Sequence, residues 1–352
     1  MREASRLFDC VQIGRPPAFC KSESIHFTQG TNIVAKKTIK VFEGFAGYGG
    51  ASFGLKRSGL KHKVIGYSEI DKPACILFEK NFPGIKNYGD ITKLAPEVIP
   101  DFDLFTGGFP CQPFSTAGKG LGELDIRGTL FYDIIRICEA KKPKWILLEN
   151  VRGLTTAKHK KTFDKILSEL KRIGYENAAY HVLNTKDYGI PQNRERLWIF
   201  AQYGGLPENF NIVPPPIKLS GKIDAFLDKV PPSNLYLNDA QIEHLKEKHN
   251  IESFVVKTPV CFDVYNKRIK TNGLCPTLTD PMHNSIRVIE VGKKGKEIVR
   301  KLSIAEQFRL MGFKDGELDT AELSYTQLSK RAGNGWDVNI VGILLKHIWE
   351  QL

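Results

Sequence analysis

Short runs of residues that favour β-strands alternate with helical stretches over residues 39–201 of this chain. Alternation of this kind is typical of βαβ units, whose strands form a parallel sheet covered by helices. The pattern therefore predicts an α/β fold with a doubly wound, mostly parallel sheet. We expect strands at 39–43, 63–67, 102–105, 145–148 and 197–201, and helices at 51–57, 72–81, 129–140 and 161–173.

The texture of the chain changes at about residue 203, where prolines become frequent and helical spacing is lost. Helical spacing returns at Ser303, which forms a capping-box pattern with Glu306. The expected organisation is an N-terminal extension at 1–38, an α/β domain at 39–202, a smaller loop-rich domain at 203–302, and a segment at 303–352 that returns to the α/β domain.

The chain carries 51 Lys and Arg residues against 39 Asp and Glu residues, a formal net charge of +12. Such an excess suits a polyanionic partner, of which nucleic acid is the commonest. The seven cysteines are scattered without zinc-type spacing, so we expect no disulfide framework, no metal site and a cytoplasmic location. No apolar run approaches the length of a membrane span, and residues 1–20 lack a secretory h-region.

A glycine-rich loop, Phe45-Ala46-Gly47-Tyr48-Gly49-Gly50, follows the first expected strand and opens the first expected helix. Glycines at such a junction let the backbone approach a ligand closely, and a helix N-terminus favours polar or anionic groups. Ser52 stands where the dinucleotide fingerprint needs a third Gly or Ala, which argues against a nicotinamide enzyme. The sequence also lacks a P-loop motif.

Acidic residues follow the next two βα units. Glu69-Ile70-Asp71 comes directly after the second expected strand, where an acid characteristically binds ribose hydroxyls. Asp90 is placed to accept from an adenine amino group, although an N-cap or solvated carboxylate is the simpler interpretation of Asp90 alone. Together, at successive strand ends, these acids predict a cofactor that contains adenosine.

Cys111 lies in the stretch Gly107-Gly108-Phe109-Pro110-Cys111-Gln112-Pro113-Phe114-Ser115, directly after the third expected strand. The glycines and prolines indicate a shaped turn. A thiol at the carboxyl end of a strand faces the crevice where open α/β sheets bind ligands. A free cysteine is often only a small buried hydrophobe, but this turn favours a nucleophile.

Charged residues also lie next to two other expected strands, Glu149 directly after one and Arg194 and Arg196 directly before the other. Glu149 comes after the apolar run 145–148, so it is expected at the same sheet edge as Cys111, with a raised pKa that suits proton donation. Arg194 and Arg196 flank Glu195 before another apolar run, and alternation aims both arginines to one side, where guanidinium groups can hold carbonyl or phosphate oxygens. An ion pair with Glu195 is the alternative for either arginine.

Taken in order, these residues resemble the motifs of the DNA (cytosine-5)-methyltransferase family. The resemblance spans residue 39 to the C-terminus, and it implies an S-adenosylmethionine-dependent methyltransferase fold with a target-recognition domain at about 203–302. The matching stretches are 45–50, Glu69, Gly89-Asp90, 109–115, 127–131, 149–151, 192–196, 276–279, 311–313 and 333–335.

The resemblance implies that S-adenosylmethionine is the cofactor. Glu69 would bind its ribose, and Asp90 with Ile91 its adenine. The full set of implied cofactor contacts is Phe45, Ala46, Gly47, Gly49, Gly50, Glu69, Ile70, Asp90, Ile91, Pro110, Leu130 and Asn334.

The resemblance also implies the chemistry. Cys111 would attack carbon 6 of a cytosine as a thiolate, and Glu149 would contact ring nitrogen 3 and the exocyclic amine. Arg196, beside Arg194, would hold the carbonyl oxygen at position 2. Attack from above the ring requires the base to leave the duplex, and the glycine-rich loop at 115–128 is a candidate to close over it.

Duplex DNA is therefore the expected partner, read at one short sequence by a monomeric enzyme, with a separately encoded restriction endonuclease as a possible companion. Three positions depart from the family's usual pattern. Glu43-Gly44 stands where Asp-Leu is common, and Ile70 where an aromatic often stacks on adenine, so we expect effects on cofactor affinity. Gly335-Trp336-Asp337 varies from the commoner last motif, which we expect to matter little for the chemistry.

The nearest alternative is a cytosine-5 RNA methyltransferase of the tRNA-directed type. That relative tends to have Pro-Pro-Cys where this chain has Phe109-Pro110-Cys111, so DNA is favoured. An amino-directed DNA methyltransferase needs an Asp/Asn/Ser-Pro-Pro-aromatic turn, which the sequence lacks, and a cysteine hydrolase needs a histidine partner. The intact Cys111, Glu149 and Arg196 argue against an inert binding protein on the same fold.

Overall fold

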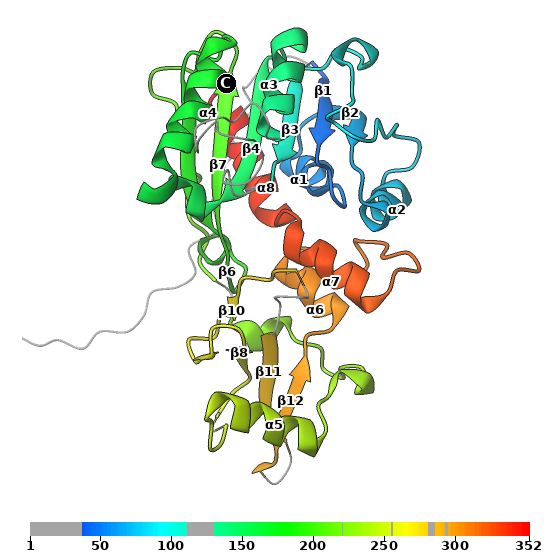
Figure 1. Ribbon diagram of the computed structural model, residues 1–352, viewed down its shortest axis with the longest axis vertical. Helices are drawn as coiled ribbons and strands as arrows, with labels where there is room; N and C mark the ends of the chain where they lie inside the picture. The colour runs from blue at the N-terminus through cyan, green and yellow to red at the C-terminus, as the bar shows by residue number, and fades with distance from the viewer. Residues whose placement is uncertain (1–36, 111–129, 220, 255, 281–285, 293–294) are drawn as a thin grey trace, which may run out of the picture. The chain divides into compact units, whose positions relative to one another are not determined.

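A six-stranded sheet with strand order β2-β1-β3-β4-β7-β5 is built from strands that lie between residues 39 and 202 (Figure 1). Strands β1 to β4 pair in parallel, and β7 is antiparallel to both β4 and β5, so the predicted mostly parallel sheet is confirmed. The strands are β1 (Ile39–Gly44), β2 (His62–Ser68), β3 (Leu104–Gly108), β4 (Trp145–Val151), β5 (Ala178–Asn184) and β7 (Glu195–Gln202).

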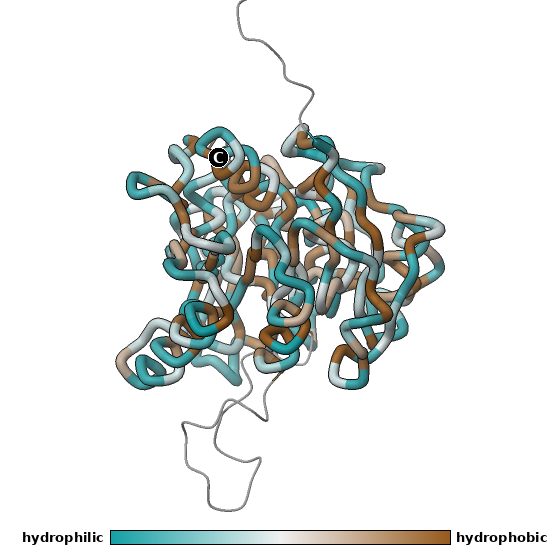
Figure 2. Tube along the Cα trace, turned by 90° about the horizontal axis from the view of Figure 1, so that it is seen from above, coloured by the Kyte–Doolittle hydropathy of each residue, from teal (hydrophilic) through white to brown (hydrophobic). Residues whose placement is uncertain are grey.

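The structure, a computed structural model, describes residues 37–110, 130–219, 221–254, 256–280, 286–292 and 295–352. Residues 37–352 form one compact unit. Hydrophobic stretches run through the middle of the trace, and hydrophilic turns lie mainly at its outside (Figure 2).

Helices cover both faces of the six-stranded sheet because neighbouring strand residues point to opposite faces. Val41 and Leu104 pack with α8 on one face, and Phe42 and Phe105 pack with α3 on the other. The predicted doubly wound arrangement follows from this alternation. The helices are α1 (Gly50–Ser58), α2 (Lys72–Asn81), α3 (Leu130–Lys141), α4 (Lys160–Arg172) and α8 (Val338–Trp349).

A second, antiparallel sheet with strand order β12-β11-β8-β9 lies within the predicted loop-rich region, with its own apolar core against α5. A short parallel pair, β10 with β6, joins this region to the segment before β7. The elements are β6 (Gln192–Asn193), α5 (Asp239–His249), β8 (Val260–Asp263), β9 (Arg268–Lys270), β10 (Cys275–Pro276), β11 (Ile286–Val291), β12 (Glu297–Lys301), α6 (Ile304–Leu310) and α7 (Tyr325–Asn334).

Short 3-10 turns connect several of these elements. They cover Pro96–Val98, Arg152–Thr155, Ala157–His159, Thr185–Asp187, Ile223–Phe226 and Ser233–Leu235.

The strand predicted at 102–105 begins later, at Leu104, and extends to Gly108. Phe102 instead packs on Phe42 in the core, and the Asp103 carboxylate accepts a hydrogen bond from the Lys40 backbone N–H at 2.9 Å, so these two residues form the entry to the strand. Strand β5 and helices α5 and α7 were not predicted.

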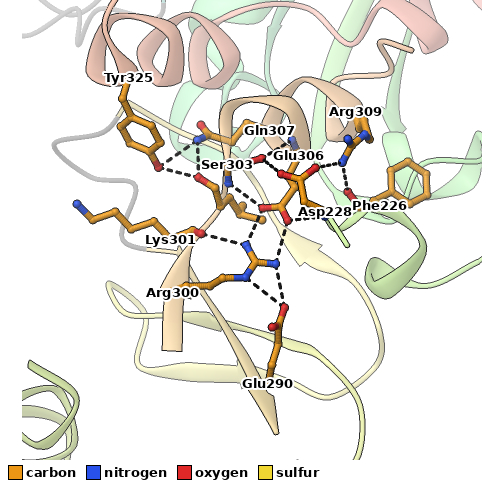
Figure 3. A network of polar contacts seen from close by, with 11 residues as sticks. Phe226, Asp228, Glu290, Arg300, Lys301, Ser303, Glu306, Gln307, Arg309 and Tyr325 are labelled. Carbon is orange, nitrogen blue, oxygen red and sulfur yellow. Dashed lines mark hydrogen bonds and ion pairs between the residues drawn. The ribbon is translucent and has the colours of Figure 1, made fainter. Parts of the chain in front are cut away.

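A buried charged network connects β11 and β12 to the start of α6 (Figure 3). The Arg300 guanidinium, fully buried, donates to both carboxylate oxygens of Glu306 at 2.8 and 2.9 Å and to Glu290 at 2.8 Å. Glu306 also accepts from the Ser303 backbone N–H at 2.7 Å, and the Ser303 hydroxyl accepts from the Glu306 backbone N–H. The predicted capping box is therefore confirmed, and the same carboxylate neutralises a buried cation.

Candidate active site

The carboxyl ends of β1, β3 and β4 meet at one edge of the sheet, and the candidate site lies there. Gly44 pairs with Gly107, and Gly108 pairs with Glu149. A cavity of about 420 Å³ opens at this edge, and a narrower one of about 50 Å³ adjoins it. The predicted site residues that line at least one of the two cavities are Phe45, Ala46, Gly47, Gly50, Glu69, Pro110, Glu149, Arg194, Arg196 and Asn334.

The glycine-rich loop turns between β1 and α1 in a way that side chains would obstruct. Gly49 is the N-cap of α1 with φ 88°, in the left-handed region that favours glycine. A β-carbon at Gly49 would lie 2.7 Å from the ring of Phe82, and one at Gly50 would lie 2.8 Å from the Trp336 β-carbon. The loop therefore needs glycine for both conformation and space.

The Glu69 carboxylate is held by the backbone around it. It accepts from the Gly47 N–H at 2.9 Å, from the Ile70 N–H at 2.8 Å and from the Asp71 N–H at 2.9 Å. A carboxylate has about four acceptor sites, so one remains for a hydroxyl of a ligand. The bond to Gly47 also fixes the glycine-rich loop against the end of β2.

Five predicted cofactor contacts line neither cavity in the part of the chain that the structure describes: Gly49, Ile70, Asp90, Ile91 and Leu130. The Ile70 side chain is 71% exposed, whereas Ile91 is buried in the core. Asp90 accepts from the Thr92 backbone N–H at 3.0 Å and from its hydroxyl at 2.8 Å, and these bonds lower the pKa of Asp90. This turn matches the simpler interpretation of Asp90.

Glu149 and Arg196 face each other from β4 and β7. Arg196 Nε lies 2.9 Å from Glu149 Oε1. Burial raises the pKa of Glu149 above its ordinary value, although the positive charges of Arg196 and Arg194 oppose this effect. A buried carboxyl group with a raised pKa suits proton donation to a ligand in the cavity.

Arg194 is buried and held by backbone carbonyls. Its guanidinium donates to Leu278 O at 2.9 Å, Gly333 O at 3.1 Å and Gly335 O at 2.7 Å. Burial lowers the pKa of Arg194 to about 9. Arg194 thus connects the segment before β7 to the segment after β10 and to the C-terminal end of α7, and it also lines the larger cavity.

The Glu195 carboxylate pairs with Arg152 rather than with Arg194 or Arg196, the two arginines of the alternative interpretation. Glu195 accepts from Arg152 at 2.7 Å, at the exposed end of β4.

Cys111 lies outside the described residues, as do the loop at 115–128 and the predicted match at Arg127. Pro110, directly before Cys111, is described and lines the larger cavity. The chain leading to it is held by Asn150, whose Nδ2 donates to Phe109 O at 3.0 Å. Cys111 therefore follows three residues after Gly108, the register partner of Glu149.

A buried carboxyl group at the end of β1 entered the sequence analysis only as a departure from the family's usual Asp-Leu. Glu43 is 1% exposed, and burial raises the pKa of Glu43 from 4.5 to about 7, although the hydrogen bond from the Ser52 hydroxyl opposes this shift. The sequence signal was present, since Ser52 replaces the small apolar residue of a dinucleotide fingerprint. Thr106 Oγ1, also buried, lines the narrow cavity without a hydrogen-bond partner among the described residues.

Trp336 and Arg331 are two further residues of the site that the sequence analysis missed. Trp336 lines the narrow cavity, and its indole nitrogen and the Glu149 carboxyl group both lie beside Gly108, where Trp336 lowers the pKa of Glu149. Arg331 forms an ion pair with Asp71 at the wall of the larger cavity. Both depend on contacts between residues far apart in the chain.

The described residues contain no cluster of three His, Cys, Asp or Glu side chains that could hold a metal ion. In the same part of the chain, no helix is long and apolar enough to span a membrane.

A doubly wound sheet with a glycine-rich loop after its first strand and a carboxyl–arginine pair at its carboxyl edge defines an α/β enzyme that binds ligands at that edge. The sequence matches the model of the C-5 cytosine-specific DNA methylase family over residues 39–350. The chain belongs to this family and is a DNA (cytosine-5)-methyltransferase.

Curated relatives agree with the family over most of the chain. The chain is 39% identical to Type II methyltransferase M.HaeII of Haemophilus aegyptius, over 87% of this chain and 91% of the relative. It is 37% identical to Type II methyltransferase M.NgoBI of Neisseria gonorrhoeae, over 86% of this chain and 90% of the relative.

Solved structures share the fold at low identity. A Spodoptera frugiperda DNMT2 mutant has a TM-score of 0.66 at 20% identity and covers 89% of this chain and 100% of its own. The S. pombe Dnmt2 methyltransferase has a TM-score of 0.67 at 18% identity and covers 89% of this chain and 99% of its own. These likenesses confirm the predicted methyltransferase fold.

Proposed function

We propose that this enzyme transfers a methyl group from S-adenosylmethionine to carbon 5 of a flipped-out cytosine, within a short specific sequence of duplex DNA, through a covalent adduct on Cys111. The observation that carries the proposal is the Glu149–Arg196 pair, which lies in the larger cavity, in register with the strand end that leads to Cys111. An RNA substrate is the alternative, and the final measurement below separates the two.

The residues at the sheet edge fit S-adenosylmethionine. The Gly47 backbone leaves open space, since a β-carbon there would meet nothing within 4 Å, and Glu69 keeps acceptor capacity for a ribose hydroxyl. The unpartnered Thr106 hydroxyl offers the narrow cavity a polar contact. When bound, S-adenosylmethionine supplies the methyl group as an electrophile.

The protein side of the reaction divides among three groups. The Cys111 thiolate forms a bond to carbon 6, and Glu149 holds a proton at ring nitrogen 3, so that carbon 5 becomes a nucleophile. Arg196 holds the carbonyl oxygen at position 2, and Arg194 positions the backbone beside it. After methyl transfer, a water molecule takes the proton from carbon 5, and the electron pair left behind re-forms the double bond to carbon 6. The bond between sulfur and carbon 6 then breaks, Cys111 leaves as a thiolate, and the proton at ring nitrogen 3 returns to Glu149.

The remaining features of the proposal concern the partner. Residues 203–302 form the target-recognition domain, where basic side chains contact phosphates and thereby position the DNA. The exposed members of this set are Lys218, Lys222, Lys229, Lys257, Lys267 and Arg268, and Lys270 is half-buried. The enzyme acts as a monomer in the cytoplasm, and the Type II relatives support a separately encoded restriction endonuclease as its companion.

Trapping the adduct tests the role of Cys111. Duplex DNA that contains 5-fluorocytosine blocks the last step, because fluorine at carbon 5 cannot leave as a proton does. With S-adenosylmethionine and this DNA, the wild-type enzyme should form a complex that survives denaturing electrophoresis, with the DNA attached to the peptide that contains Cys111. Cys111→Ser should form none and lose methyl transfer, yet bind S-adenosylmethionine with unchanged affinity in calorimetry.

Cys75→Ser is the matched control, because Cys75 is a half-buried thiol that hydrogen-bonds to Glu69 O and plays no part in the proposed chemistry. It should retain the trapped complex. Retained turnover in Cys111→Ser would remove the covalent mechanism.

A further inference from the structure

Trp336 lies at the junction of several elements of the site, two residues before α8 begins. The Tyr48 hydroxyl donates to the Trp336 backbone carbonyl, and the Trp198 ring packs edge-on against the Trp336 ring with centroids 4.9 Å apart. The Trp336 side chain also forms part of the wall of the narrow cavity. These contacts fix the position of the indole ring.

The indole nitrogen faces the Glu149 carboxyl group across Gly108. A β-carbon at Gly108 would lie 2.6 Å from Trp336 Nε1 and 3.1 Å from Glu149 Oε2, so glycine is required for the two groups to meet there. The side-chain hydrogen bond from Trp336 favours the ionised form of Glu149.

The Glu149 carboxyl group therefore has a nitrogen donor on the side of each oxygen. Arg196 Nε lies 2.9 Å from Oε1, and Trp336 approaches Oε2. Two donors on different elements, β7 and the segment before α8, leave the carboxyl plane little freedom to rotate. A group that must meet the edge of a cytosine ring needs such an orientation.

Trp198 shows that a buried tryptophan in this fold does not need an indole partner. It is the other ring of the edge-on pair, and its Nε1 is buried without a hydrogen-bond partner among the described residues. Trp336 therefore differs from Trp198 in having a carboxyl group near its indole nitrogen.

We propose that Trp336 is a positioning residue for Glu149: its indole N–H orients the carboxyl group that contacts cytosine, and its ring links that group to the wall of the cofactor cavity. This inference rests on the proposed function. It also revises the expectation that the variation at 335–337 matters little for the chemistry.

Within the part of the chain that the structure describes, the charged and titratable groups that face Glu149 are Arg196 from β7, Arg194 before β7, and Tyr48 before α1. Removal of the indole donor takes away a contact that stabilises the carboxylate, so the pKa of Glu149 should rise further. Because the protonated form serves the proposed reaction, the alkaline limb of the kcat profile should move to higher pH. The acid limb, which belongs to other groups, should stay in place.

The test compares Trp336→Phe with Trp198→Phe in the full-length enzyme. Trp336→Phe keeps a ring in the cavity wall but removes the donor, so kcat should fall by about tenfold or more, while the KM for S-adenosylmethionine changes little. Trp198→Phe removes an unpartnered N–H and should shift neither limb of the pH profile. If Trp336→Phe loses its fold, replacement of Trp336 by benzothienylalanine removes the same N–H within an almost identical shape.

A second readout does not depend on methyl transfer. Carbon-13 labelling of glutamate carboxyl groups gives the Glu149 titration by NMR, assigned by the signal missing from Glu149→Gln. Trp336→Phe should move this titration to higher pH, and Trp198→Phe should not.

The inference is overturned if the Glu149 titration and the kcat profile of Trp336→Phe match those of the wild type, or if the kcat shift persists in a Glu149→Gln background. A shifted titration in an enzyme that transfers no methyl group would support the contact and refute the proposed function instead.

Discussion

Glu149 is the residue on which the proposed chemistry depends most directly after Cys111. Its side chain is half-buried and lies beside Arg196, and the loss of solvent raises the pKa of its carboxyl group. Glu149→Gln keeps the shape but removes the proton that the group would supply. We expect methyl transfer to slow by about 10²–10⁴-fold, the usual contribution of a general acid, in single-turnover assays.

Glu195→Gln is the control for this variant, because Glu195 lies nearby on β7 but pairs with Arg152 at the exposed end of the strand. Its rate should stay close to that of the wild type. An unchanged rate in Glu149→Gln would mean that the proton comes from another group.

Glu43 predicts a pH dependence of stability. Burial raises the pKa of Glu43 from 4.5 to about 7 in the folded protein. The folded state therefore retains a proton that the unfolded state releases, and the stabilising effect is complete below pH 4.5 and is lost as the pH rises through about 7. One pH unit of difference corresponds to about 1.4 kcal/mol, so the loss amounts to about 3 kcal/mol.

Glu43→Gln cannot titrate at this position. The difference between the Tm of the variant and the Tm of the wild type should therefore shift in favour of the variant as the pH rises across this range. Calorimetry of the apoprotein from pH 5 to pH 8 would check it. Parallel Tm curves for the two proteins would contradict the raised pKa.

At the scale of elements, helices α1 and α8 pack closely because each has a glycine at the point of contact. A β-carbon at Gly54 would lie 2.2 Å from Val341 Cγ1, and one at Gly342 would lie 2.9 Å from the Arg57 β-carbon. Gly54→Ala gains about 1 kcal/mol in helix propensity but overpacks the contact by about 1–3 kcal/mol, so we expect a net loss of unfolding free energy.

Chemical denaturation would measure this loss, and Val341→Ala in the same chain should recover part of it because the two sites couple. Gly153→Ala is the control, since the nearest atom to its added β-carbon lies 3.8 Å away. Equal effects at positions 54 and 153 would argue against close packing of α1 on α8.

The predictable elements are those with a clear apolar period. α2 matches its predicted bounds, and α1, α3 and α4 differ by one or two residues, because their buried faces repeat along the sequence. β5 was missed because it is an edge strand whose middle residues, Tyr180 and His181, are exposed. The α5 helix buries only Ile242 and Leu245, too few to give a period.

Two helix caps in the sequence were not used to predict helices. Asn238 with Gln241 and Ser324 with Gln327 form capping boxes at the starts of α5 and α7. The same pattern at Ser303 had correctly predicted α6.

At the scale of the whole molecule, the network around Arg300 stabilises the connection between the second sheet and α6. Both Arg300 and Glu306 have fully buried side chains. Removal of one partner leaves an uncompensated buried charge, so Glu306→Gln should lower the unfolding free energy by about 3–5 kcal/mol.

Glu243→Gln provides the comparison, because Glu243 pairs with Lys246 but its side chain is 65% exposed. Its cost should be below about 1 kcal/mol. Urea titrations that gave equal losses for both variants would show that burial does not govern the effect.

The sequence could predict that site residues from different strands lie close together, because parallel strands present their carboxyl ends at one edge of the sheet. That rule brought Phe45, Glu69 and Glu149 together correctly. It could not predict Trp336 beside Glu149 or the carbonyl contacts of Arg194, which join residues more than eighty positions apart. Asp90 accepts from Thr92 within its own turn, and its contact with adenine stays a prediction, since a sequence position alone does not tell a turn from a ligand contact.

The most direct test of the account is methyl transfer from labelled S-adenosylmethionine to duplex DNA, followed by bisulfite sequencing. We predict that the enzyme methylates carbon 5 of cytosine at every copy of one short motif and leaves other cytosines unchanged. Absence of label in DNA, with methylation or a covalent complex on RNA instead, would contradict the account and assign the enzyme to RNA.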